Sequence, residues 1–170
     1  MKNIPFIRKT LVFCSLLVFF SCEDSLPDYY LEKEYNLTNF DQVKLGDAFQ
    51  IEIVQAEEFK VIAKGEERDL NDLILVVEGN LLTGRYRQGS RNHKRTMIQI
   101  HLPELKSFEV HSASFTKISG FHDAEKDLTL KVSGAAEAHF TGNARNLVVY
   151  VHGASLLSLT GEEEDRKSVV

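Results

Sequence analysis

The residues of this sequence whose types could support chemistry are histidines, alternating carboxylates and one basic segment. Two of the six histidines, His111 and His152, each follow a valine at the same position of a repeated motif. If equivalent strands stack about 4.8 Å apart, two histidines separated by two strands lie about 9–10 Å apart. That distance is too long to share a zinc ion, whose bonds to nitrogen are about 2 Å. We therefore expect solvated surface histidines.

Three carboxylates, Asp123, Glu125 and Asp127, alternate in the segment FHDAEKD. Alternate side chains of an extended chain point the same way, and Ca²⁺ takes oxygen ligands. No glycine-bearing calcium loop surrounds these residues, so a polar loop is the favoured interpretation and calcium the alternative. We expect neither a metal nor another cofactor.

A basic segment, RYRQGSRNHKR (85–95), is the best local candidate for contact with a ligand. Its cations are Arg85, Arg87, Arg91, Lys94 and Arg95. On an exposed loop they could bind anionic glycans or phosphate-bearing envelope polymers. The favoured interpretation is a long solvated hairpin loop, and contact with such a ligand is the alternative. The sequence contains no catalytic constellation, and we expect a protein that is not an enzyme.

Short strands must position these residues. A repeat in the C-terminal half indicates how those strands are arranged. Three eleven-residue units share five columns: VHSASFTKISG (110–120), VSGAAEAHFTG (132–142) and VHGASLLSLTG (151–161). Their first residues are separated by 22 and 19 positions. Fixed periods near 20 are typical of solenoids. We expect Val110, Val132 and Val151 to stack directly over one another.

Each unit is expected to contain two strands and two corners. The corner segments SAS, GAA and GAS hold only small side chains, because successive corners stack at the spacing of strands. Glycine also permits a positive φ angle. The glycines predicted to form structural turns are Gly120, Gly134, Gly142, Gly153 and Gly161.

The preceding residues also favour strands. Apolar residues alternate in FQIEIV (49–54) and MIQIHL (97–102), which predicts strands with one buried face. The apolar run LILVV (73–77) predicts a strand covered on both faces, and EERDLND (66–72) predicts a short helical turn. No stretch keeps an apolar period of 3.6 residues, so the predicted class is all-β, with short solenoid coils of about 20 residues.

The N-terminus predicts export. Residues 1–21 combine a basic start, the apolar run LVFCSLLVFF and Ser21, which is typical of a secretory signal peptide. The run is too short to span a bilayer. Cys22 then resembles the acylated cysteine of bacterial lipoprotein signals; the alternative is an ordinary signal with an incidental cysteine. The other cysteine, Cys14, lies inside the signal, so cleavage would leave no intrachain disulfide.

Composition limits the class of protein further. At 170 residues, 43% hydrophobic and 26% charged, the chain predicts one globular domain. The net charge of −5 would become −8 on cleavage, because residues 1–21 carry three cations and no acid. This acidity argues against nucleic acid as a partner. Residues 22–39 are expected to form a polar tether, and residues 162–170 an acidic tail that either caps the stack or marks a truncated reading frame.

The segments FDQVKLGDAFQIEIVQ and IQIHLPELKSFEVHSAS, with the repeated G-A-S turns, resemble the putative auto-transporter adhesin, head GIN domain family. The resemblance covers residues 40–161. It implies a right-handed β-helix-like solenoid in secreted or lipid-anchored proteins, known mostly from Bacteroidetes. The family has no agreed catalytic motif, so the resemblance assigns no active residues.

We therefore expect a lipid-anchored envelope protein, an outer membrane lipoprotein facing the surface or the periplasm, that acts as a non-catalytic interaction or adhesion module. Its expected partners are the membrane through Cys22, a glycan or protein at the cell surface, and a second copy through the open solenoid end. One alternative is a structural or signalling accessory lipoprotein without an external ligand. The other, a carbohydrate-active β-helix enzyme, would need a long groove across many coils, and this chain has about three.

Overall fold

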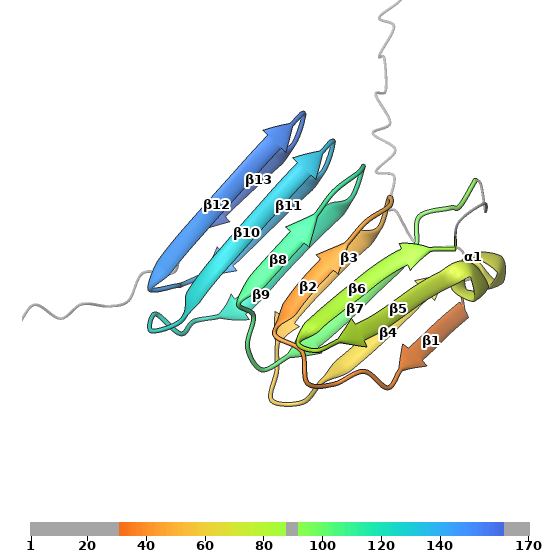
Figure 1. Ribbon diagram of the computed structural model, residues 1–170, viewed down its shortest axis with the longest axis horizontal. Coiled ribbons are helices and arrows are strands. Elements are labelled where there is room, and N and C mark those ends of the chain that lie inside the picture. The colour runs from red at the N-terminus through yellow and green to blue at the C-terminus, as the bar shows by residue number, and fades with distance from the viewer. Residues whose placement is uncertain (1–30, 88–91, 162–170) are drawn as a thin grey trace, which may run out of the picture.

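The computed structural model describes residues 31–87 and 92–161, which form two facing β-sheets and one short helix (Figure 1). The strands are β1 (Leu31–Tyr35), β2 (Gln42–Leu45), β3 (Gln50–Gln55), β4 (Lys60–Gly65), β5 (Leu73–Glu78), β6 (Leu81–Tyr86), β7 (Met97–Leu102), β8 (Ser107–Val110), β9 (Phe115–Phe121), β10 (Asp127–Gly134), β11 (Glu137–Gly142), β12 (Asn146–Gly153) and β13 (Leu156–Thr160). The helix, α1, spans Glu67–Asp72. No helix in these described residues is long and apolar enough to cross a membrane.

The two sheets combine parallel and antiparallel pairs. One has seven strands in the order β1-β4-β7-β3-β9-β11-β13, and the other has six in the order β12-β10-β8-β2-β6-β5. The pairs β1–β4, β4–β7 and β5–β6 are antiparallel, whereas every other pair is parallel. The antiparallel pairs involve β1, β4, β5, β6 and β7 and lie at one end of the molecule (Figure 1).

Alternation along each strand creates the core between the sheets. In β3, Ile51 and Ile53 are at most 1% exposed, whereas Glu52 between them faces outward and accepts a hydrogen bond of 2.8 Å from Gln99 of β7. Phe49 and Phe108 are fully buried in the same core. Burial of such side chains contributes about 1.5–3 kcal/mol each.

The repeated units stack in register, as the sequence predicts. Val132 of β10 pairs with Val110 of β8 on one side and with Val151 of β12 on the other. In the facing sheet, Phe140 of β11 pairs with Ile118 of β9 and Leu159 of β13. Equivalent side chains therefore lie next to one another in each sheet.

The predicted β-helix-like solenoid is nevertheless wrong. Each repeat supplies one strand to each of two facing sheets, and the N-terminal strands add antiparallel neighbours. The result is a mostly β, sandwich-like fold of two mixed sheets. The repeat spacing predicts which C-terminal strands are neighbours, but the N-terminal half has no repeat from which the direction of its strands could be inferred.

Three further expectations can be compared with the structure. The helical turn predicted over residues 66–72 is confirmed as α1. The run LILVV is not covered on both faces, because Val76 of β5 is 38% exposed. The segment expected to be a tether overlaps β1, whose residues pair with β4. The predicted signal peptide, Cys22 and the acidic tail lie outside the described residues.

Candidate functional site

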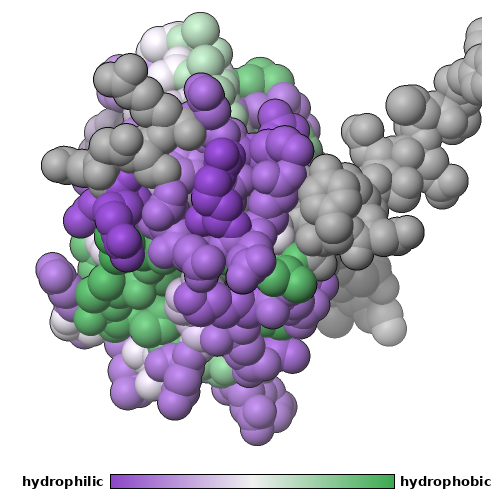
Figure 2. Space-filling model, turned by 90° about the vertical axis from the view of Figure 1, so that its right-hand side faces the viewer, coloured by the Kyte–Doolittle hydropathy of each residue, from purple (hydrophilic) through white to green (hydrophobic). Residues whose placement is uncertain are grey.

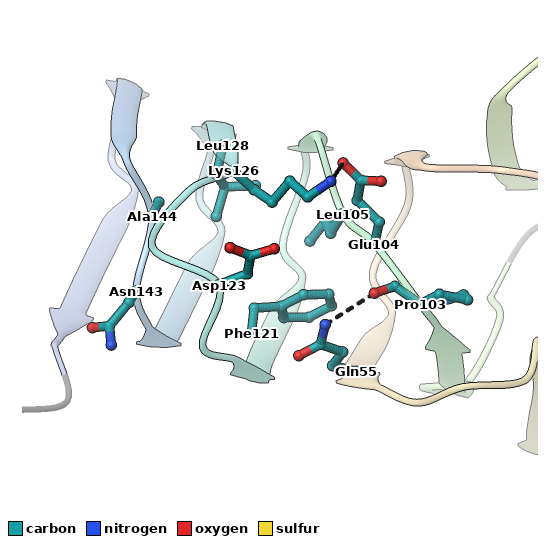
Figure 3. Close-up of a pocket in the computed structure, with 10 residues that line it drawn as sticks. All are labelled: Gln55, Pro103, Glu104, Leu105, Phe121, Asp123, Lys126, Leu128, Asn143 and Ala144. Carbon is teal, nitrogen blue, oxygen red and sulfur yellow. Dashed lines mark hydrogen bonds and ion pairs between the residues drawn. The ribbon is translucent and has the colours of Figure 1, made fainter. Parts of the chain in front are cut away.

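A pocket of about 180 Å³ lies where successive connections pass from one sheet to the other (Figure 3). It is bordered by the β7–β8, β9–β10 and β11–β12 connections and by the end of β3. Its lining is half polar and half apolar: Gln55, Pro103, Glu104, Leu105, Phe121, Asp123, Lys126, Leu128, Asn143 and Ala144.

The pocket coincides with the unequal spacing of the repeats. Ile118 pairs with Phe140, 22 positions later, whereas Leu128 pairs with Leu147, only 19 positions later. The additional residues of the longer repeat must therefore lie between β9 and β10. One of them is accounted for at Gly120, where the pairing with β11 shifts by one residue. Bulges of this kind commonly redirect a strand next to a functional site.

Backbone hydrogen bonds hold the long connection at both of its ends. The N–H of Asn143 donates to the carbonyl of Phe121 at 2.8 Å, and the N–H of Arg145 donates to the carbonyl of Lys126 at 2.7 Å. Between these points the β9–β10 connection has more residues than the β11–β12 connection beneath it. The longer connection therefore cannot follow the shorter one residue for residue, and we attribute the pocket to this mismatch.

The floor of the pocket is apolar. Phe121, Leu105 and Leu128 are 7%, 4% and 4% exposed, and belong to the hydrophobic core. Ala144 adds a small, partly buried side chain that packs against this core. Because these residues also support the sandwich, the floor is part of the fold and exists before any ligand binds.

Polar groups surround this floor. Oδ1 of Asp123 accepts the N–H of Glu125 at 2.9 Å, whereas no described residue is bonded to its Oδ2. The Lys126 ammonium lies 3.5 Å from Glu104 in a loose ion pair, and Gln55 donates from Nε2 to the carbonyl of Pro103 at 3.0 Å. In Figure 3 the Asp123 carboxylate lies between Phe121 and Lys126. The rim thus combines acceptors with one cationic donor.

The predicted basic segment lies away from this pocket, beside α1. Arg85 is exposed on β6, in a shallow depression that Lys44 and His111 also line. The backbone N–H of Arg87 donates to the carbonyl of Asp72, and Lys94 pairs with Glu66. Arg95 is exposed, and Arg91 lies outside the described residues.

The carboxylate of Asp69, on α1, organises the end of that basic segment. It is fully buried, accepts the N–H of Lys94 at 2.9 Å, and lies 3.0 Å from Nδ1 of His93. The His93 ring stacks on Tyr86 with centroids 3.7 Å apart. Burial raises the pKa of Tyr86 to about 12, and its hydroxyl hydrogen-bonds with Thr96 at 2.6 Å. Asp69 cannot be singled out from the sequence, because an acid in a short polar helix is usually solvated.

The other chemically interesting residues are not brought together. His111 lies against Gly46, His152 lies beside Ser133 on the neighbouring strand, and both histidines are exposed. Asp127 accepts two hydrogen bonds of 2.9 Å from Arg145, which lower its pKa to about 2. Over residues 31–87 and 92–161, no three His, Cys, Asp or Glu side chains are grouped to hold a metal ion.

Two of the predicted glycine turns, Gly134 and Gly153, occupy crowded corners, whereas a Cβ atom on Gly161 would have no atom within 4 Å. Gly134 and Gly153 have φ angles of +81° and +78°, and Ser112 takes the same conformation at the equivalent position. A Cβ atom on Gly134 would lie 2.8 Å from the backbone nitrogen of Ser112. Gly120 lies at the bulge of β9, Gly142 ends β11, and Gly161 directly follows β13.

Several solved structures share this two-sheet fold. A putative adhesin from Bacteroides fragilis aligns with a TM-score of 0.70 at 16% identity, covering 76% of this chain and 62% of that one. A putative adhesin from Parabacteroides distasonis gives 0.59 at 11% identity, covering 78% and 66%. A putative lipid binding protein from the same species gives 0.56 at 14% identity, covering 79% and 68%. This chain thus spans less than two thirds of the length of both adhesins, and these identities establish similarity of fold alone.

The family is established by sequence. Residues 39–170 match the model of the putative auto-transporter adhesin, head GIN domain family, and the chain belongs to that family. No curated protein was found to match it. Membership of an adhesin family favours a place at the cell envelope or surface and a role in binding rather than catalysis.

Proposed function

We propose that this protein is a non-catalytic binding module of the cell envelope, held at the outer membrane by a lipid on Cys22. The observation that carries the proposal is the pocket at the β9–β10 connection. It combines an apolar floor with a polar rim, and the stacked strands of the repeats hold it in place. Binding sites are commonly built on connections that a rigid scaffold holds in place. Membership of a family described as adhesins supports the same conclusion.

The lipid anchor is supported by the N-terminal sequence. Cys22 directly follows a signal-like segment, and it would be the only cysteine left after cleavage. An exposed free thiol is open to oxidation, and acylation removes that reactivity. Replacement of Cys22 by Ser should move the protein from the membrane fraction to the soluble fraction of its host. Retention of the Cys22→Ser variant in membranes would contradict the anchor.

A second candidate function is lipid binding, because one structural neighbour is described as a putative lipid binding protein. The apolar floor would suit a short acyl chain. Against this, the two carboxylates of Glu104 and Asp123 outnumber the one ammonium of Lys126, which disfavours an acidic headgroup. We therefore prefer adhesion. The basic segment at residues 85–95 stays a predicted second contact for anionic polymers.

The binding role can be tested with the full chain in detergent on an array of glycans and extracellular proteins. We expect selective binding to a small set of these ligands. Protease treatment of intact cells should in addition digest the protein if it faces the surface. A chain that is folded by circular dichroism and binds nothing on the array would contradict a binding module and favour a structural or signalling accessory lipoprotein.

A further inference from the structure

We infer that the pocket at the β9–β10 connection binds one pyranose ring of a neutral glycan. The inference rests on the proposed function and names the ligand class of the same site. It follows from the size of the pocket, from its amphipathic lining and from the sign of its charge.

The size of the pocket favours a single ring. Sites for drug-sized ligands usually have volumes of about 300–1,000 Å³, and this pocket has about 180 Å³. A volume of this order can hold one six-membered ring with its substituents, but not a long acyl chain. The pocket is also open to solvent at its rim, where Asp123 and Lys126 are exposed, so that the rest of a polymer could continue outside it.

The lining matches the two kinds of surface that a pyranose presents. One face of such a ring carries C–H groups, and hydroxyl groups surround its edge. The floor offers Leu105, Leu128 and Ala144, together with the accessible part of the Phe121 ring, to the C–H face. An aromatic ring carries partial negative charge on its faces, which attracts polarised C–H groups. A purely apolar ligand would cover this floor but would leave the polar rim without partners.

The rim supplies hydrogen-bonding groups that suit hydroxyls. Oδ2 of Asp123 is bonded to no described residue and can accept a hydroxyl hydrogen, whereas Oδ1 is already bonded to the N–H of Glu125. The Lys126 ammonium is only loosely paired with Glu104, at 3.5 Å, and can donate to a hydroxyl oxygen. Hydrogen bonds to charged groups are roughly twice as strong as neutral ones. A hydroxyl between Asp123 and Lys126 would therefore be held from both sides.

The charge of the pocket distinguishes neutral from acidic ligands. Two carboxylates, Glu104 and Asp123, line it against one ammonium, Lys126, so its lining is net negative. A uronic acid, a phosphate or a fatty acid would bring a further negative charge toward Asp123. Because like charges in proximity are destabilising, we expect neutral sugars to bind more tightly than their acidic counterparts.

Saturation-transfer difference NMR on the full chain in detergent provides the test. The probes are methyl glycosides of neutral hexoses and 6-deoxyhexoses, with glucuronate and hexanoate as anionic ligands. We expect signals from the ring protons of at least one neutral glycoside, with a dissociation constant of about 1 mM, equivalent to about 4 kcal/mol. Hexanoate or glucuronate binding more tightly than every neutral glycoside would overturn the inference.

Substitutions assign the binding to this pocket. Asp123→Asn keeps the acceptor for the N–H of Glu125 but removes the charge, and should weaken binding at least tenfold. Glu125→Gln removes a charge from the same loop at a residue that does not line the pocket, and should change affinity less than twofold. Ala144→Leu should block binding by filling the floor. Melting temperatures near that of the wild type would show that each variant is folded.

The possible results separate this inference from the proposed function. If Asp123→Asn and Ala144→Leu bind sugar as the wild type does, the pocket is not the site, although the chain would still be a binding module. If the array detects only proteins or acidic glycans, the ligand class is wrong but binding stands. If the array detects no ligand at all, the proposed function itself fails.

Discussion

The two ends of the sandwich are completed in different ways. At the end formed by β1, β5 and α1, antiparallel strands extend the sheets, and the surface is largely hydrophilic (Figure 2). At the other end every strand pair is parallel, and the last two strands, β12 and β13, expose apolar side chains. These side chains are Leu147, Val148, Val149, Tyr150, Val151, Leu156 and Leu159.

One column of the repeat shows what this difference means. Val110, Val132 and Val151 are the same residue in the same register, yet their exposed fractions are 0%, 1% and 43%. Only the neighbours differ. The repeat therefore specifies side chains suited to the interior of a stack, and burial at each position depends on whether another unit covers it.

Shortening the equivalent apolar side chain to alanine should destabilise the protein more in the covered repeat than in the uncovered last repeat. Phe140 and Leu159 pair in adjacent strands but are 3% and 48% exposed. We expect Phe140→Ala to lower the free energy of unfolding by about 3–5 kcal/mol, and Leu159→Ala by about 1 kcal/mol, because much of that side chain is already in water. Chemical denaturation of both variants would measure this. Equal losses would mean that β13 is covered in solution, as in self-association.

The opposite end should depend on a polar network. Asp69→Ala leaves the N–H of Lys94 and the His93 ring without their buried partner, and should lower the free energy of unfolding by about 3 kcal/mol. Asn71→Ala, at an exposed position of the same helix, is the control and should have little effect. Denaturation curves provide the measurement, and proteolysis within residues 85–95 should become faster only in the Asp69 variant. Identical denaturation curves for both variants would show that Asp69 does not stabilise this end of the molecule.

Substitutions of two glycines can distinguish the destabilisation caused by close stacking from that caused by a positive φ angle. Gly134→Ala combines a positive φ with a Cβ atom placed 2.8 Å from Ser112, whereas Gly79 has a φ of +60° with no atom within 4 Å of such a Cβ. We expect thermal denaturation to show losses of about 2 kcal/mol for Gly134→Ala and about 1 kcal/mol for Gly79→Ala. Similar losses at both positions would show that close stacking of the corners contributes little.

The smallest effect concerns an ion pair between successive repeats. Arg145 lowers the pKa of Asp127 to about 2, from an ordinary value of about 3.8, by hydrogen-bonding to it. The native state therefore binds fewer protons, and the pair stabilises it above about pH 4 and is lost as the pH falls toward 2. Asp127→Asn should lower the melting temperature slightly at pH 7 and not at pH 2. Because both side chains are exposed, a large difference at pH 7 would contradict this account.

The sequence predicts the C-terminal half better than the N-terminal half, for a physical reason. Identical columns such as Val110 and Val132 can be aligned by inspection, and the strands that carry them are neighbours in the sheet. β4 and β5 each contain a continuous apolar run, VIA and LILVV, and nothing in such a run tells whether the strand is parallel or antiparallel to its neighbours. That missing information is why a β-helix was predicted where two mixed sheets are found.

The candidate site was only partly visible in the sequence. Asp123 drew attention as a member of an alternating acidic series, but its series does not act together, because Asp127 is bonded to Arg145. The floor residues Leu105 and Leu128 are far apart along the chain and meet only after folding. The sequence signal that could have found the pocket is the difference between the repeat spacings of 22 and 19 residues, which was interpreted only as a solenoid period.

The two backbone hydrogen bonds at Phe121 and Lys126 have a consequence for how such a module can diversify. They fasten the ends of the β9–β10 connection to the next layer, so that residues 122–125 can change in number or kind with little penalty to the sheets. Loop closure costs grow only slowly with loop length. Related proteins could thereby acquire new ligand preferences by changing a few residues of this connection, while the pairing of the strands stays the same.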